Sequence, residues 1–217
     1  MTAVPEYQPE NLVPAVSTKD RLIGAAIDLS SEGRDRNISI RAIARKAGVT
    51  EGAIYRHFPG KDDLLQESYQ RIAAKLIREK TALLERGGSF ADLLRGWIRI
   101  TLSFYDRNPA AFSYLLLRPP YPDCERSGNL NVQQDLLVFE LIRRGKLEAV
   151  VREESIQLQR VMLDGLLVNI PRQIQTGQLK GSAMQFYGAV VDAAERLLLV
   201  DEALQGLRNS HMYPPLR

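Results

Sequence analysis

The segment from Ser39 to Lys61, SIRAIARKAGVTEGAIYRHFPGK, restricts the possible fold more than any other part of the chain. Its first half spaces apolar residues as one face of a short amphipathic helix, at Ile40, Ile43, Ala44 and Ala47. Ser39 stands where an N-cap belongs, and Gly48 stands where a left-handed C-cap ends a helix. The pattern therefore predicts one short helix with defined ends.

A second short helix is expected directly afterwards. Thr50 can cap it, Ile54 and Phe58 would face inward, and Pro59-Gly60 would end it. Two short helices joined by a tight Ala-Gly-Val turn predict a helix-turn-helix.

The outward face of this second helix has the chemistry of a DNA reader. Arg56 can bind guanine or a phosphate, Ala53 can contact a thymine methyl, and Gly52 allows the backbone close to a groove floor. The hydroxyl groups of Thr50 and Tyr55, the imidazole of His57 and the ammonium group of Lys61 can donate hydrogen bonds to phosphate oxygens. Glu51 either accepts a hydrogen bond from cytosine or repels phosphate. The candidate DNA contacts are Arg41, Thr50, Glu51, Gly52, Ala53, Tyr55, Arg56, His57 and Lys61.

The string GVTEGAIYRHFPGKDDLL resembles the recognition segment of the tetracycline-repressor (TetR) family of bacterial transcription regulators, and the likeness runs from about Lys19 to Leu65. Ser30 departs from it, because the family usually has an aromatic residue there. The resemblance implies a helix-turn-helix domain at 18–64, joined by a long helix to an effector-binding and dimerisation domain at 65–217. It also implies double-stranded operator DNA as a partner.

The charge distribution agrees with this expectation. Residues 18–80 contain 13 Lys and Arg against nine Asp and Glu, whereas the whole chain has a net charge of only +3. The positive excess thus lies around the helix-turn-helix, where it would steer the protein toward phosphates.

Other features limit the possible functions. The only cysteine is Cys124, the two histidines lie far apart, and no catalytic motif is present, so we expect no enzyme activity, metal site or cofactor. No signal peptide or membrane span is apparent, which predicts a cytoplasmic protein. Residues 1–17 are expected to form a disordered arm.

The remaining sequence predicts an all-α fold. A capping box at Ser17–Asp20 predicts a first helix, and a second capping box at Ser89–Asp92 predicts another helix start. Helices are expected at about 61–84, 89–105 and 109–118, followed by a loop at 118–130 and a helix at 132–144 that Gly145 ends. Two long apolar helices follow, and Pro171 should kink the first of them.

The family resemblance implies a small-molecule pocket in this helical part. The candidate lining residues are Trp97, Phe104, Tyr105, Phe112, Tyr114, Phe139, Arg160, Asp164 and Asn169. The aromatic residues among them can equally be ordinary core, because helical spacing of aromatics is typical of packed interiors.

The last two helices are apolar over a wide arc, which indicates cover on more than one side. They either form the core of a monomer or pack on a second subunit as well. The residues expected at such a dimer interface are Met162, Leu166, Phe186, Val190, Ala194 and Leu197.

The leading hypothesis is therefore a ligand-responsive homodimeric repressor. A regulator without a small-molecule effector and a helical interaction scaffold that has lost DNA binding are the alternatives.

Overall fold

The computed structural model describes residues 17–32, 38–117 and 128–212, and these residues form an all-α fold. The N-terminal unit contains α1 (Thr18–Glu32), α2 (Ile40–Ala47) and α3 (Glu51–Tyr55). The larger body contains α4 (Lys61–Arg86), α5 (Phe90–Arg107), α6 (Pro109–Phe112), η1 (Ser113–Leu117), α7 (Gly128–Leu147), α8 (Ile156–Gln175), η3 (Ala183–Phe186), α9 (Tyr187–Leu198) and α10 (Asp201–Met212).

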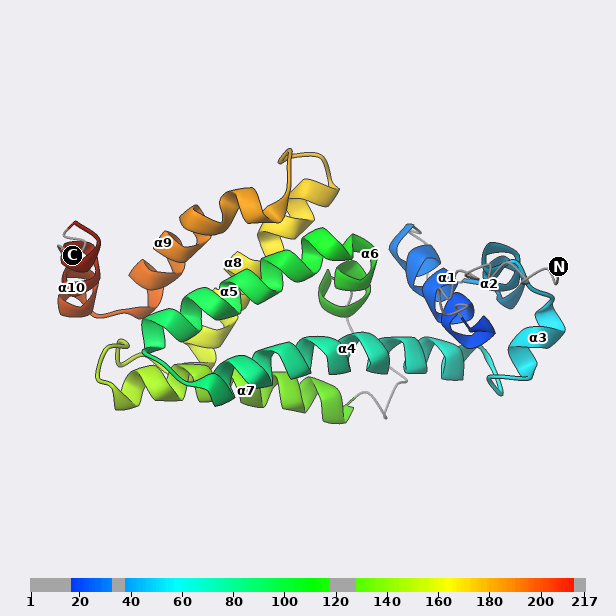
Figure 1. Ribbon diagram of the computed structural model, residues 1–217, viewed down its shortest axis with the longest axis horizontal. Coiled ribbons are helices and arrows are strands. Elements are labelled where there is room, and N and C mark those ends of the chain that lie inside the picture. Colours follow the sequence, from blue (N-terminus) through cyan, green and yellow to red (C-terminus); the bar gives the residue numbers. More distant parts are fainter. Residues whose placement is uncertain (1–16, 33–37, 118–127, 213–217) are drawn as a thin grey trace, which may run out of the picture.

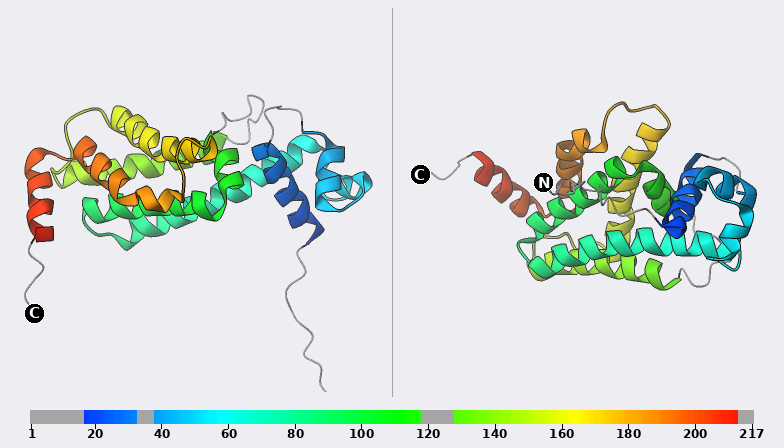
Figure 2. Two further views of the ribbon diagram at one scale, coloured as in Figure 1. Left: turned by 90° about the horizontal axis from the view of Figure 1, so that it is seen from above. Right: turned by 45° about the vertical axis from the view of Figure 1, so that its right-hand side comes forward.

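Helix α4 connects the two parts of the molecule. Its 26 residues span about 39 Å at 1.5 Å per residue, and it runs from the N-terminal unit along the body (Figure 1). One hydrophobic cluster packs α1–α3 against the first turns of α4, and a second fills the body between α4, α5, α7, α8 and α9. Figure 2 shows α1–α3 at one end of the elongated molecule and α10 at the other.

The predicted helix ends are confirmed where a capping residue marks them. The hydroxyl oxygen of Ser17 accepts a hydrogen bond from the Asp20 amide at 3.1 Å and so caps α1. Ser89 caps α5 in the same way, accepting from the Asp92 amide at 3.2 Å.

Gly145 does not end α7, contrary to the sequence prediction, and the helix continues to Leu147. Glycine occurs at this position because neighbouring side chains leave no room for a Cβ atom. A Cβ at this position would lie 2.3 Å from Val151 Cγ2 and 2.7 Å from Phe90 Cδ2, so no larger residue fits. The chain that follows α7 pairs with the end of α9 in one antiparallel bridge. Its two backbone hydrogen bonds run from Arg152 N to Leu198 O and from Val200 N to Val150 O.

Two other predicted segments lie almost entirely outside the described residues. The predicted loop at 118–130 lies outside the described residues except for its last three positions, which begin α7. The predicted arm at 1–17 also lies outside them, apart from Ser17. Helix α10 was not predicted. Within the described ranges, no helix is both long and apolar enough to cross a membrane.

Candidate nucleic-acid interface

Helix α2 has the predicted ends. The Ser39 hydroxyl accepts a hydrogen bond from the Ala42 amide at 3.1 Å, and Gly48 adopts φ +67°, the left-handed conformation that glycine enters most easily. Ile43, Ala44 and Ala47 are buried against α1 and α3. This packing fixes the angle at which the chain enters α3.

Helix α3 is shorter than predicted. It ends at Tyr55 rather than near Phe58, and the amides of His57 and Phe58 both bond to the Ile54 carbonyl in a closing turn. Pro59 prevents the helix from continuing beyond this turn, because the residue before a proline is disfavoured in the helical conformation. Ile54 and Phe58 are nevertheless buried, as predicted, and they fix the orientation of the short helix.

Most predicted DNA-contacting side chains point away from the protein. Ala53 and Lys61 are half-buried, and seven others are exposed: Arg41, Thr50, Glu51, Gly52, Tyr55, Arg56 and His57. Thr50 precedes α3 at the N-cap position, but its hydroxyl makes no capping hydrogen bond. Within the described residues, Arg41, Arg56 and Lys61 have no ion-pair partner, so all three cations are available to an external anion.

Other charges in this region are paired and hold α1 on α4. Lys19 forms an ion pair with Glu67 at 2.8 Å, and Arg71 pairs with both Asp20 and Glu67. The Ser17 hydroxyl and Arg71 lower the pKa of Asp20. The N-terminal unit thus rests on α4 through a small ionic network as well as through its core.

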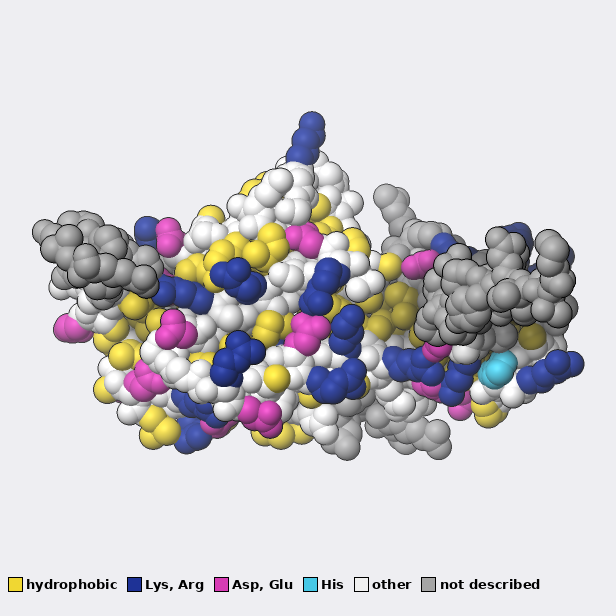
Figure 3. Space-filling model, in the orientation of Figure 1, with side chains coloured by type: hydrophobic (Ala, Val, Ile, Leu, Met, Phe, Trp, Pro, Cys, Tyr) yellow, Lys and Arg dark blue, Asp and Glu magenta, His cyan; other side chains and the backbone are white. Residues whose placement is uncertain are grey.

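Basic side chains are prominent at the end of the molecule that carries this unit. Figure 3 shows several Lys and Arg groups there beside a histidine. His57 is the histidine whose side chain the structure describes. The positive excess expected from the sequence is therefore displayed on this surface.

The predicted effector-pocket residues separate into inner and outer groups. Phe104, Tyr105 and Phe112 are buried and pack against one another, with ring centroids 5.3 and 6.3 Å from Phe112. Tyr114 is also buried, and its hydroxyl donates to the Leu65 carbonyl at 2.7 Å. Trp97 is buried on α5, whereas Arg160 and Asp164 lie half-buried on α8.

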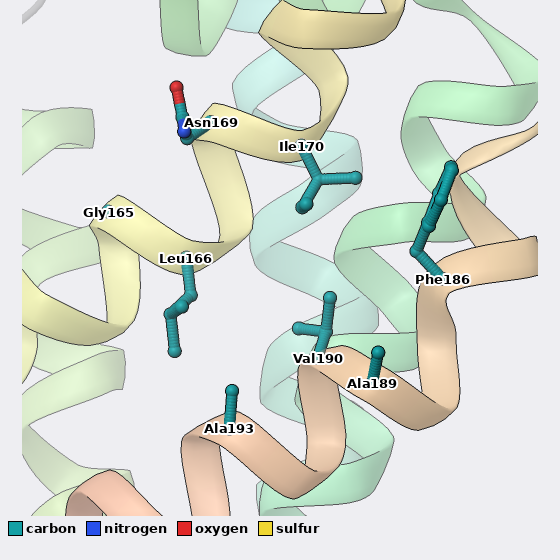
Figure 4. Close-up of a pocket in the computed structure, with 8 residues that line it drawn as sticks. All are labelled: Gly165, Leu166, Asn169, Ile170, Phe186, Ala189, Val190 and Ala193. Carbon is teal, nitrogen blue, oxygen red and sulfur yellow. The ribbon is translucent and has the colours of Figure 1, made fainter. Parts of the chain in front are cut away.

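Two members of the predicted pocket are on the outside. Phe139 is 45% exposed on the outer side of α7, because Val138, Leu141 and Ile142 form the buried face of that helix. Asn169 lies beside an open apolar groove of about 180 Å³ between α8 and α9, and its amide points away from α9 (Figure 4). We therefore remove both from the candidate pocket.

The residues of the predicted dimer interface differ in exposure, and Leu166, Phe186 and Val190 line the open groove between α8 and α9. Val190 and Ala194 are buried within a single chain, where α9 packs on α5 and α8. Leu166, Phe186 and Leu197 are half-buried, and Met162 is exposed. Packing on α5 and α8 accounts for the burial of Val190 and Ala194, and the dimer interface stays a prediction.

Sequence reasoning missed a buried lysine. Lys80 is 8% exposed and occupies the same face of α4 as Ile72, Leu76 and Leu84. A lysine in an apolar stripe with i, i+4 spacing is the signal that would have found it.

The comparisons with known proteins agree with this arrangement. Residues 22–68 match the family model described as bacterial regulatory proteins, tetR family. A TetR family transcription regulator from Marinobacter aquaeolei is similar in fold, with a TM-score of 0.71, 14% identity, and coverage of 84% of this chain and 95% of the other.

Two further solved structures share the fold. The ketosteroid transcriptional regulator of Mycobacterium tuberculosis has a TM-score of 0.73 and 17% identity, with 85% of this chain and 96% of the other covered. The fatty acid degradation regulator of Bacillus halodurans has a TM-score of 0.69 and 19% identity, with 81% and 97% covered. Residues 22–68 thus match the DNA-binding segment of tetR-family bacterial regulatory proteins, and the chain shares the fold of these three structures.

Proposed function

We propose that this chain is a TetR-family homodimeric repressor that binds operator DNA through α3 and releases it when a small molecule enters the helical body. The observation that carries the proposal is the set of exposed residues from Thr50 to His57 on and beside α3. The buried Ile54 and Phe58 hold this helix on the N-terminal unit. We assign Arg56 and Ala53 to base edges, with Arg41 as a third reader. Lys61 and the exposed hydroxyl groups of Thr50 and Tyr55 are assigned to phosphates.

An exposed apolar face supports dimerisation. Seven of the eight large apolar side chains that are exposed among the described residues lie on the neighbouring helices α7 and α8, at Val132, Leu136, Phe139, Leu147, Leu158, Val161 and Met162. Val132, Leu136 and Phe139 on α7 follow i, i+4, i+7 spacing, so these three form one stripe. Large exposed apolar patches mark interaction sites, and a second copy of this chain would cover the face.

A dimer would also meet the needs of DNA recognition. One recognition helix reads only a few base pairs, whereas two copies can read half-sites about 34–36 Å apart. A dimer built on the α7–α8 face leaves both N-terminal units free to reach DNA, because those units lie at the far end of α4 (Figure 1).

The contacts between body and N-terminal unit supply a route for ligand control. Ile27 of α1 packs against both hydrophobic clusters, and α6 and η1 contact α1. Tyr114 of η1 is bonded to the Leu65 carbonyl on α4. A ligand that favours one arrangement of these elements would change the separation of the two DNA-reading units, by a shift of population.

Two alternatives predict other behaviour. A regulator without an effector would bind DNA with no response to small molecules, and a scaffold that has lost DNA binding would not discriminate between DNA sequences. Repression of transcription from chromosomal DNA would place the protein in the cytoplasm.

The test uses two glycines with equally open surroundings. A Cβ added at Gly52 on α3 or at Gly24 on α1 meets no atom within 4 Å, so glutamate fits at either position without disturbing the fold. Both changes alter net charge equally. We expect Gly52→Glu to abolish operator binding in electrophoretic titrations, whereas Gly24→Glu retains it. Equal affinities for the two variants and the wild-type chain would reject α3 as the reader.

A further inference from the structure

The body contains a buried cation that nothing in the proposed DNA-binding function uses. Lys80 of α4 places its ammonium nitrogen 4.0 Å from the centroid of the Trp97 ring on α5. In the part of the chain that the structure describes, this ammonium, which has three N–H donors, makes no hydrogen bond or ion pair. Burial lowers the pKa of Lys80 to about 8, and the Asp164 carboxylate opposes that shift.

Three more buried nitrogen donors in the body lack a partner. Among the described residues, no acceptor contacts Trp97 Nε1, Gln134 Nε2 or Arg160 Nε. All three are N–H donors, as Lys80 is, and buried donors in native proteins are nearly always hydrogen-bonded. Four buried donor groups without an acceptor indicate that this part of the protein binds a ligand that supplies hydrogen-bond acceptors.

Contacts between side chains connect these groups across four helices. Lys80 stacks on Trp97 and interacts electrostatically with Asp164 of α8. Asp164 lies 3.5 Å from Arg160, which also pairs at 2.7 Å with Asp135 of α7, the residue after Gln134. Helices α4 and α5 pack together, and both pack against α7, which packs against α8. Lys80, Trp97 and Arg160 therefore belong to one region between these helices, next to the turn of α7 that carries Gln134.

We propose that this region binds the carboxylate of a small organic acid, with Lys80 as its counter-ion and Trp97, Gln134 and Arg160 as hydrogen-bond donors. The inference rests on the proposed ligand control and specifies the chemical class of the effector. A carboxylate accepts several hydrogen bonds and can form the direct ion pair that Lys80 does not make with Asp164. The body cluster is otherwise apolar, so the remainder of the acid is an apolar group.

Asp164 balances the buried charge when the site is empty. Burial raises the pKa of Asp164, while Lys80 and Arg160 oppose the rise. An incoming carboxylate competes with this side chain for the same cations. Replacing Asp164 with asparagine therefore removes a competitor and should strengthen acid binding.

The chain offers a built-in reporter for the test. Trp97 is its only tryptophan, so the intrinsic tryptophan emission of the full-length protein reports on this region alone. The probes are octanoate and phenylacetate, each paired with its neutral amide, at pH 7. We expect the acids to change the emission saturably and to bind at least tenfold more tightly than the amides.

Variants identify the groups responsible. Lys80→Met should weaken acid binding at least tenfold, and Asp164→Asn should tighten it. Lys75→Met is the matched control, because Lys75 is an exposed lysine on the same helix, and it should bind acids like the wild-type chain. Circular dichroism verifies that each variant is folded.

Several results would overturn the proposal: no saturable response to either acid, equal affinity for acids and amides, or wild-type acid binding by Lys80→Met. Operator binding is measured separately on the same proteins, and Lys80→Met should retain it. Operator binding without acid binding rejects the effector class alone, whereas absence of operator binding rejects the proposed function itself.

Discussion

Replacing Lys80 with methionine is expected to stabilise the folded protein at pH 7. Methionine retains the apolar stem beside Trp97 and removes the buried ammonium. The pKa of Lys80 falls from 10.5 to about 8 on folding, and each unit corresponds to about 1.4 kcal/mol, so the buried charge lowers the free energy of unfolding by at most about 3 kcal/mol. The substitution also removes the stabilising cation–π contact, which lowers the free energy of unfolding of the variant by about 0.5–2 kcal/mol. The expected net gain is about 1–3 kcal/mol.

The pH dependence of this gain has a definite sign. Below pH 8 both the folded and unfolded states hold the Lys80 proton, and the full penalty is present. Between about pH 8 and 10.5 the unfolded state binds more protons, so the stability of the wild-type chain rises relative to the variant. Asp164 is the charged group that acts on Lys80, and it is unchanged in both proteins. The advantage of methionine should therefore shrink across this window.

Urea denaturation followed by circular dichroism measures the effect, at equal protein concentration and at pH 7 and 10. For a chain of this size, a gain of 1–3 kcal/mol also raises the melting temperature by about 2–12 °C. Destabilisation by Lys80→Met, or a difference independent of pH, would show that Lys80 has a stabilising partner and would refute the reasoning.

Four further substitutions test the interface, the dimer and the core. Lys61→Ala should weaken all DNA sequences equally and reduce the slope of log K against log salt by roughly two per dimer, because each lost phosphate contact removes about 0.9; an unchanged slope would exclude Lys61 from the interface. Arg56→Ala should relax base preference at one position per half-site by about 1–3 kcal/mol, whereas a uniform loss over operator variants would make Arg56 a phosphate contact. Met162→Arg should give a helical monomer with weak DNA binding in sedimentation, since Met162 is 42% exposed on the α7–α8 face; a dimer with native affinity would place the interface elsewhere. Gly145→Ala should cost about 1–3 kcal/mol of stability through overpacking against Val151 and Phe90, and native stability in urea would contradict that packing.

The sequence predicted those helix ends that are determined by residues close together in the chain. The caps at Ser39 and Ser89 and the left-handed Gly48 were correct, because each is decided by hydrogen bonds or conformation within one helical turn. The length of α3 was overestimated, because a closing turn at His57 and Phe58 replaces the last helical turn and still buries Phe58.

Periodicity identified apolar faces but not the elements that cover them. Phe139 was expected inside and lies outside, while Val190 was expected between subunits and lies inside one chain. The role of Gly145 depends on contact with residues from other elements, which spacing along α7 does not reveal. Lys80 was missed for a related reason, because its burial follows from packing on Trp97.

Selection of DNA from a random duplex library by the full-length protein tests the central claim most directly. The account predicts enrichment of an inverted repeat whose half-sites are centred about one helical turn apart. It also predicts that Gly52→Glu, titrated against the enriched duplex, does not bind, while Gly24→Glu binds as the wild-type chain does. A library that remains unenriched after repeated rounds, or enrichment that Gly52→Glu reproduces, would contradict sequence-specific recognition through α3.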